Sequence, residues 1–199
     1  KARGIDVQKE IRLGFPAEEL IRYSAEFDLV IMGTTGEGGI LNKVFGSVSS
    51  AVAQRADCPV ILVPTGAAFS RINRVLYAGR YEAADTRMVE RLLAFNEVFH
   101  ACIHFVHVKD AAGDLFEKEK EQIFSVLFRE GEPPFAFEIA ELEGESVPDA
   151  LNAYAEAQHI ELVVLVTRRR NFWEQLFHKS NTRGMARISE RPLMVLHLA

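Results

Sequence analysis

The chain has 199 residues, 48% hydrophobic and 26% charged, which is the composition of an ordinary globular protein with a sizeable core. Its formal net charge of -5 argues against a surface that neutralises nucleic-acid phosphates, so nucleic acid is not an expected partner. No run approaches the roughly 20 apolar residues that a membrane-spanning helix requires, so no membrane partner is expected either.

The N-terminal stretch KARGIDVQKE lacks the charged start and apolar core of a signal peptide, which favours a cytoplasmic protein. The two cysteines, Cys58 and Cys102, lie beside or within the apolar runs CPVILVP and CIHFVHV. We therefore expect two reduced, buried thiols rather than a disulfide.

Short runs rich in Val, Ile, Leu and Phe alternate with helical patterns, which is the order of strand-helix-strand units that build a parallel sheet. The runs DLVIMG and ELVVLV are almost continuously apolar, as central strands covered on both faces are. In chain order, the patterns predict a strand at 4–13, a helix at 16–26, a strand at 28–33, a helix at 47–56, strands at 59–64 and 73–78, a helix at 84–99, a strand at 102–108, a helix at 114–130, a strand at 134–142, a helix at 147–158, a strand at 161–166, a helix at 180–190 and a strand at 192–198.

The chain repeats itself at an offset of 133 residues, which lays DLVIMGTTG on ELVVLVTRR and CPVILVP on RPLMVLH without a gap. Repeats of this size are domains rather than solenoid units. We predict a partial first domain at 1–66, a linker at 67–71 and a second domain at 72–199. By the same offset, the part of the first copy present in this chain begins at its third strand. The first two strands and the first two helices of that copy are therefore expected to be absent from this chain.

The loop MGTTGEGGILNKVFGSVSS carries glycines where a backbone would approach a ligand. Gly33 ends a buried strand, Gly36 allows a tight turn, and Gly46 with Ser47 begins a helix. The first N–H groups of a helix have no internal partners and carry the positive end of its dipole, so this arrangement predicts a phosphate site. The alternative is that the glycines only shape a tight loop and Ser47 only caps the helix.

The pattern G-TT-G-EGGILNKVF-G-S resembles the nucleotide motif of the universal stress protein family. The resemblance extends over the whole chain, through DLVIMG, SVSSAVAQRADCPVILVP, RVLYAG, IHFVHV and PLMVLHL. It implies an α/β fold of the flavodoxin-like, adenine-nucleotide-hydrolase-like kind, with a parallel sheet in strand order 3-2-1-4-5, here in two tandem copies of which the first is partial. In members that carry the motif, it also implies ATP at the carboxyl ends of strands 1 and 4.

The same resemblance assigns the binding residues of the first domain. Met32 and Gly33 would lie beside the nucleotide at the end of its strand, and Gly36, Gly46 and Ser47 would hold the phosphates of ATP, with or without Mg²⁺. Val48 and Ser49 would follow in the first helical turn. In the second domain the glycines map to Val166, Arg169 and Lys179, with only Ser180 retained, so we expect a degenerate copy that does not bind ATP in this manner.

Neither a metal site nor a catalytic centre is legible in the spacing. His104 and His107 lie three apart on a predicted strand, so their side chains point to opposite faces and cannot share one metal ion. We therefore expect no zinc site. No arrangement of nucleophile and general base is visible, so the sequence predicts at most slow ATP hydrolysis.

The leading hypothesis is a cytoplasmic stress-response protein that binds adenine nucleotide through its first domain and signals to an unidentified protein partner. The alternative is a scaffold or interaction module of the same fold that binds no nucleotide. A nucleotide-hydrolysing enzyme is a third, weaker hypothesis. In the family the fifth strands of two domains often pair, so we expect 59–64 and 192–198 to be neighbours, forming an internal pseudo-dimer or supporting a homo-oligomeric dimer. Residues 1–15 are expected to be displaced or paired with another chain, because an exposed strand edge has unpaired backbone N–H and C=O groups that can pair with another chain.

Overall fold

The computed structural model describes residues 4–34, 46–67, 71–78, 86–109, 116–129, 131–144, 146–168 and 191–198. Its regular elements in chain order are α1 Pro16–Tyr23, the short 3₁₀ helix η1 Ser24–Glu26, β1 Val30–Gly33, α2 Ser47–Arg55, β2 Val60–Val63, β3 Arg74–Ala78, α3 Thr86–Asn96, β4 Cys102–Val108, α4 Phe116–Leu127, β5 Phe137–Leu142, α5 Val147–Ala157, β6 Leu162–Arg168 and β7 Leu193–Leu198. The predicted elements are confirmed within a few residues, except for two. The predicted strand at 4–13 is wrong, and the predicted helix at 180–190 lies outside the described residues.

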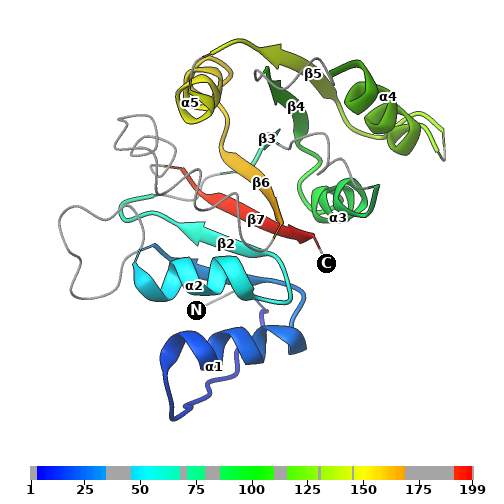
Figure 1. Cartoon of the computed structure of the whole chain (residues 1–199). Helices are drawn as coiled ribbons and strands as arrows, with labels where there is room; N and C mark the ends of the chain where they lie inside the picture. The colour runs from blue at the N-terminus through cyan, green and yellow to red at the C-terminus, as the bar shows by residue number, and fades with distance from the viewer. Residues whose placement is uncertain are drawn as a thin grey trace.

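The strands form one seven-stranded sheet in the order β1-β2-β7-β6-β3-β4-β5. Every neighbouring pair is parallel except β2 and β7, which run antiparallel with Ile61 opposite Met194. The predicted pairing of 59–64 with 192–198 is therefore confirmed. The predicted α/β class with a mostly parallel sheet is confirmed as well, and Figure 1 shows the helices distributed over the sheet.

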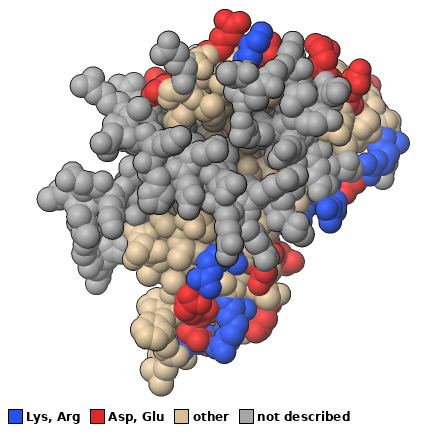
Figure 2. All heavy atoms as spheres, in the orientation of Figure 1, with Lys and Arg blue, Asp and Glu red and all other residues tan. Residues whose placement is uncertain are grey.

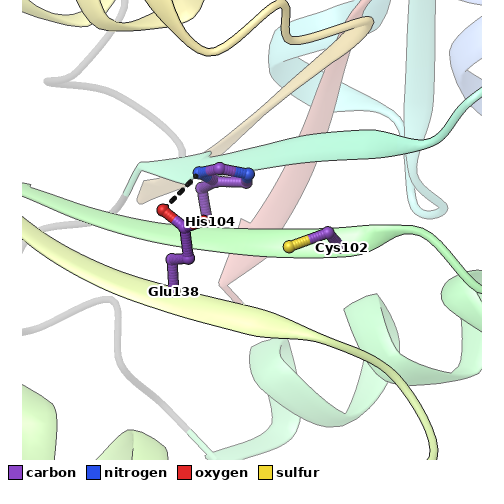
Figure 3. Close-up of side chains that lie close together, drawn as sticks. All are labelled: Cys102, His104 and Glu138. Atoms are coloured by element: carbon purple, nitrogen blue, oxygen red, sulfur yellow. Dashed lines mark ion pairs between the residues drawn. The ribbon is translucent and has the colours of Figure 1, made fainter.

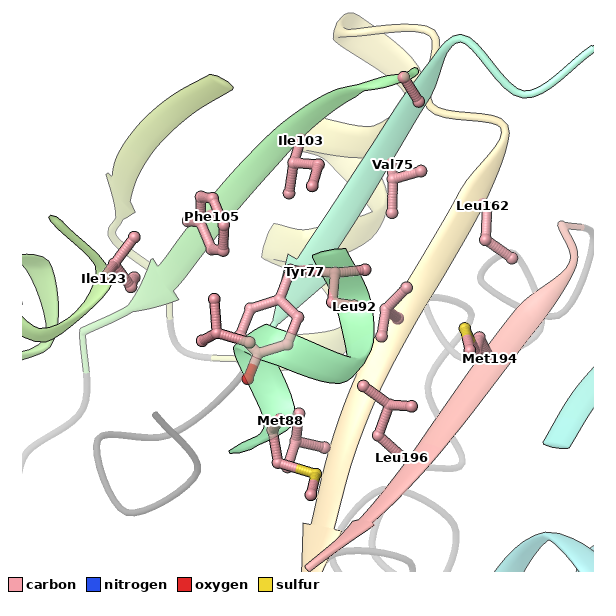
Figure 4. Close-up of a cluster of buried hydrophobic side chains, with 14 of the residues drawn as sticks. Val75, Tyr77, Met88, Leu92, Ile103, Phe105, Ile123, Leu162, Met194 and Leu196 are labelled. Atoms are coloured by element: carbon pink, nitrogen blue, oxygen red, sulfur yellow. The ribbon is translucent and has the colours of Figure 1, made fainter. Parts of the chain in front are cut away.

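Helices cover both faces of the sheet because side chains alternate along each strand. On one face α2 and α5 enclose an apolar cluster that includes Val52, Leu62 and Leu151. On the other face α3 and α4 enclose a second cluster, drawn in Figure 4, in which Tyr77 and Phe105 meet edge to face at 5.6 Å. The central strand β6 contributes to both clusters, which explains its nearly continuous apolar run. The expectation that DLVIMG forms a central strand is wrong, because β1 lies at the end of the described sheet and Ile31 is 64% exposed.

The segment before α1 lies outside the sheet. Residues 4–15 alternate apolar and polar side chains as a strand does, yet no strand forms among them. Five apolar side chains of this segment are at least 65% exposed: Ile5, Val7, Ile11, Leu13 and Phe15. A strand requires a hydrogen-bonded neighbour, and none of the described strands lies beside this segment. We expect residues 1–15 to be displaced from the sheet or paired with another chain, and the position of residues 4–15 outside the sheet is consistent with displacement.

Polar contacts hold this segment against α1. The guanidinium of Arg12 lies 3.4 Å from the centre of the Tyr23 ring and 2.8 Å from the carboxylate of Glu10. On α1 itself, Glu18 pairs with Arg55 of α2 at 2.9 Å. Figure 2 shows acidic and basic side chains interspersed on the described part of the side that faces the viewer.

Within the described residues, no helix combines the length and apolar character that crossing a membrane requires.

Candidate functional site

The end of β1 and the start of α2 meet through the backbone. The N–H of Gly46 donates a 2.7 Å hydrogen bond to the carbonyl oxygen of Thr34, and the N–H of Thr34 donates to the carbonyl of Val63 on β2. Residues 35–45 lie outside the described residues, and so does the predicted binding residue Gly36. The two ends of that segment are thus fixed to each other at the carboxyl ends of the parallel strands β1 and β2.

A buried serine strengthens the same junction. The hydroxyl of Ser49 donates to the carbonyl oxygen of Thr34 at 2.9 Å and lies 3.0 Å from the carbonyl oxygen of Gly46. Ser49 and Thr34 are 3% and 4% exposed. The Ser49 hydroxyl therefore holds the two ends of the loop together. Of this predicted binding residue, the backbone N–H in the first turn of α2 remains as the donor for a ligand. Sequence reasoning missed the role of Thr34, since nothing in the loop pattern links it to Ser49.

The residue that caps α2 is Gly46, not Ser47. Gly46 has extended backbone angles, φ -67° and ψ 159°, and the helix begins at Ser47, whose side chain is exposed. The capping role that the alternative gives to Ser47 is therefore wrong, whereas its other part, in which the glycines only shape a tight loop, stays a prediction. The first N–H groups of an α-helix have no intrahelical partners, and in α2 these belong to Ser47, Val48 and Ser49. They lie at the positive end of the helix dipole, as a phosphate site requires.

Space rather than backbone angles favours glycine at position 46. A Cβ added to Gly46 would lie 3.3 Å from the carbonyl oxygen of Thr34 and 3.6 Å from the hydroxyl oxygen of Ser49. Its negative φ is open to any residue. The close approach of the end of β1 to the start of α2 therefore accounts for this glycine. Glycine also places no side chain of its own over the N-terminus of the helix.

The other predicted residues lie at the end of β1. Met32 is half-buried and packs against the apolar cluster beneath α2, whereas Gly33 is exposed and lies opposite Val63. The described residues at this junction, 32–34 and 46–49, are all uncharged. Any attraction for an anion in this described part must therefore come from backbone N–H groups and the dipole of α2.

Replacing Ser49 with alanine tests this junction. The Thr34 carbonyl would lose one of its two donors, so we expect the free energy of unfolding to fall by about 0.5–1.5 kcal/mol in urea titrations. Ser47→Ala is the matched control, because Ser47 is exposed in the same turn, and we expect a change within about 0.5 kcal/mol. Equal losses in both variants would contradict the assigned hydrogen bond.

Comparisons with known proteins agree with the sequence resemblance. The model of the universal stress protein family matches residues 1–64 and 72–197. The chain is 37% identical over 62 residues to universal stress protein MJ0531 of Methanocaldococcus jannaschii, covering 30% of this chain and 36% of that protein. It is 33% identical over 61 residues to universal stress protein Rv2005c of Mycobacterium tuberculosis, covering 31% of this chain and 21% of that protein. The alignments thus span about a third or less of these relatives' lengths.

A solved universal stress protein from Archaeoglobus fulgidus superimposes with a TM-score of 0.72 at 20% identity, over 96% of this chain and 68% of that chain. The mostly parallel sheet covered by helices on both faces defines a flavodoxin-like α/β protein. Because the family model matches most of its residues, the chain belongs to the universal stress protein family.

Proposed function

We propose that this chain is a cytoplasmic stress-response protein that binds ATP where β1 ends and α2 begins, and that the bound nucleotide regulates an unidentified protein partner. The hydrogen bond from Gly46 N–H to the Thr34 carbonyl carries the proposal. It places a strand end beside the N-terminus of a helix, which is the arrangement that binds phosphate groups. The binding residues are those of the motif, namely Met32, Gly33, Gly36, Gly46, Ser47, Val48 and Ser49.

Backbone donors would hold the phosphates in this site. The N–H groups of Ser47, Val48 and Ser49 would donate to phosphate oxygens, and Gly46 would admit them because it has no side chain. A Mg²⁺ ion would enter with the triphosphate, since the described residues of the junction contain no carboxylate. The proposal includes at most slow hydrolysis of the bound ATP.

The tandem organisation is part of the proposal. The pair β1-β2 and the pair β7-β6 are each parallel, and they meet through the antiparallel pairing of β2 with β7. Two copies related by an internal two-fold axis would produce this pattern, with domains at 1–66 and 72–199 and a linker at 67–71. The strands of the second copy then lie in the order β5-β4-β3-β6-β7, which is 3-2-1-4-5.

A scaffold of the same fold is the second candidate, and an exposed sheet edge favours it. Ile31 on β1 is 64% exposed, and among the described strands β1 pairs only with β2. An open edge with apolar side chains is suited to pairing with another chain, either a second copy or a different protein. In this candidate function, the glycine loop only connects β1 to α2 and binds no nucleotide.

Hydrogen exchange with and without ATP distinguishes the two candidates. We expect ATP, titrated in the presence and absence of Mg²⁺, to slow amide exchange in residues 46–50 by engaging the first N–H groups of α2. The start of α5 is the matched control, because its first turn is capped by the Ser146 side chain and lies in the second proposed domain. Its exchange is expected to stay unchanged.

The other outcomes of this experiment favour different conclusions. Absence of ATP binding by calorimetry would overturn the proposal and leave the scaffold candidate. ATP binding with no protection at 46–50 would place the nucleotide elsewhere and would remove the role assigned to the start of α2.

A further inference from the structure

Three metal-ligating side chains lie together on one face of the sheet, outside the α2 junction. Cys102 and His104 are two apart on β4, so both point to the same face. Glu138 of β5 lies directly opposite His104 in the register of the two strands. Figure 3 shows the three side chains grouped on the same side of these strands. Sequence reasoning missed this set, because the position of Glu138 opposite His104 depends on the register of β4 and β5.

The donor atoms are close to coordination distances. One donor atom from each residue lies within 4.8 Å of the other two. The Nδ1 atom of His104 is 3.4 Å from Oε2 of Glu138. In a tetrahedral zinc site with the usual bond lengths, neighbouring nitrogen, oxygen and sulfur ligands lie about 3.4–3.6 Å apart. A side-chain movement on the order of 1 Å would bring the whole set to that spacing.

The imidazole has unused binding capacity. His104 is 1% exposed, and its Nδ1 atom lies 3.0 Å from the hydroxyl oxygen of Tyr154 on α5. Its Nε2 atom is buried and has no hydrogen-bond partner among the described residues. Buried polar atoms are nearly always paired, because an unpaired one loses its hydration without compensation. Metal ligation at Nε2 would supply the partner that this atom lacks among the described residues, whereas ligation at Nδ1 would replace its contact with the Tyr154 hydroxyl.

We propose that Cys102, His104 and Glu138 form a binding site for a divalent metal ion of the zinc class. A thiolate, an imidazole and a carboxylate are all ligands of zinc, and the thiolate disfavours the harder ions Mg²⁺ and Ca²⁺. Three protein ligands leave a fourth tetrahedral position for water or an external ligand. The site is distinct from the proposed nucleotide site, because it involves β4 and β5 rather than β1 and α2.

Metal binding at Cys102 would be coupled to proton release, because the thiolate rather than the thiol is the form that ligates a metal. Burial lowers the pKa of His104, and the nearby Glu138 opposes this shift. Burial, followed by the charge of Glu138, raises the pKa of Cys102. A bound metal ion must displace that thiol proton to form the thiolate complex.

Cobalt(II) titration of the full chain under reducing conditions tests the site. We expect one Co²⁺ per chain, with the near-ultraviolet absorption of a thiolate-to-cobalt charge transfer and with displacement by Zn²⁺. Cys102→Ala is expected to abolish this absorption. The matched control is Cys58→Ala, which removes a buried thiol outside the cluster and should leave the absorption unchanged. Glu138→Gln should weaken Co²⁺ binding at least about tenfold, because loss of even an outer-shell partner costs about that much.

Several results would overturn this proposal. They are the absence of saturable binding by the parent chain, a charge-transfer band that survives Cys102→Ala or disappears in Cys58→Ala, and unchanged affinity in Glu138→Gln. Circular dichroism of every variant must match that of the parent, so that loss of fold is not mistaken for loss of a ligand. Glu138 is 56% exposed, and Glu138→Gln therefore serves as the variant that preserves folding.

Discussion

We expect Gly46→Glu to weaken ATP binding at least about 100-fold while the chain remains folded. Its carboxylate would stand at the N-cap of α2, where the phosphates are proposed to bind. Two unit charges about 4 Å apart at an effective dielectric constant of about 20 repel by about 4 kcal/mol, which corresponds to roughly three orders of magnitude in affinity. The same carboxylate lies at the positive end of the helix dipole, so α2 itself is not expected to lose stability through its charge.

Calorimetry with ATP measures this loss, and two further variants separate its causes. Gly46→Ala introduces the Cβ that approaches the Thr34 carbonyl at 3.3 Å, without any charge, and isolates the steric effect. Gln54→Glu adds the same charge near the other end of α2 and should leave the affinity within about twofold, because exposed charges separated by about a Debye length are screened. Unchanged ATP affinity in Gly46→Glu would exclude the start of α2 as the phosphate site.

The second large effect concerns the antiparallel junction of β2 and β7. Val195 is fully buried, opposite Val60 on one side and Leu165 on the other. Val195→Asp would place a carboxylate in a cluster whose described members are all apolar. We expect a loss of at least about 4 kcal/mol in the free energy of unfolding, through charge burial and lost apolar contacts. This is a large share of the stability of an ordinary domain.

Urea unfolding followed by circular dichroism provides the measurement, with Val7→Asp as the matched control. Val7 is 65% exposed in the segment before α1, so the same substitution there should change the free energy of unfolding by less than about 0.5 kcal/mol. Similar midpoints for Val195→Asp and the parent would contradict the burial of β7 between β2 and β6. A large loss in Val7→Asp would show that residues 4–15 pack more closely than the structure indicates.

Much of the fold could be predicted because local pattern and tertiary role agree. The apolar runs around β1 and β6 predicted strands, and the pairing of 59–64 with 192–198 followed from the repeat and the family resemblance. The resemblance to the universal stress protein family is confirmed by the family model. The assignment of ATP to the motif residues stays a prediction, as do the cytoplasmic location and the partner.

Other features depended on contacts between residues distant in sequence. The alternation in residues 4–13 predicted a strand that does not form, because a strand exists only where another strand supplies hydrogen bonds. The capping position of α2 fell on Gly46 because its N–H binds the Thr34 carbonyl, a bond that no local rule anticipates.

The sequence by itself determined most of the strands and helices that the structure describes, and which family the chain resembles. It could do so because side-chain alternation and glycine spacing are properties of neighbouring residues. Only the tertiary structure decided that Ser49 reaches the Thr34 carbonyl and that Glu138 lies opposite His104 beside Cys102. Those contacts depend on strand register and helix placement, which are set by packing of the whole sheet rather than by any single segment.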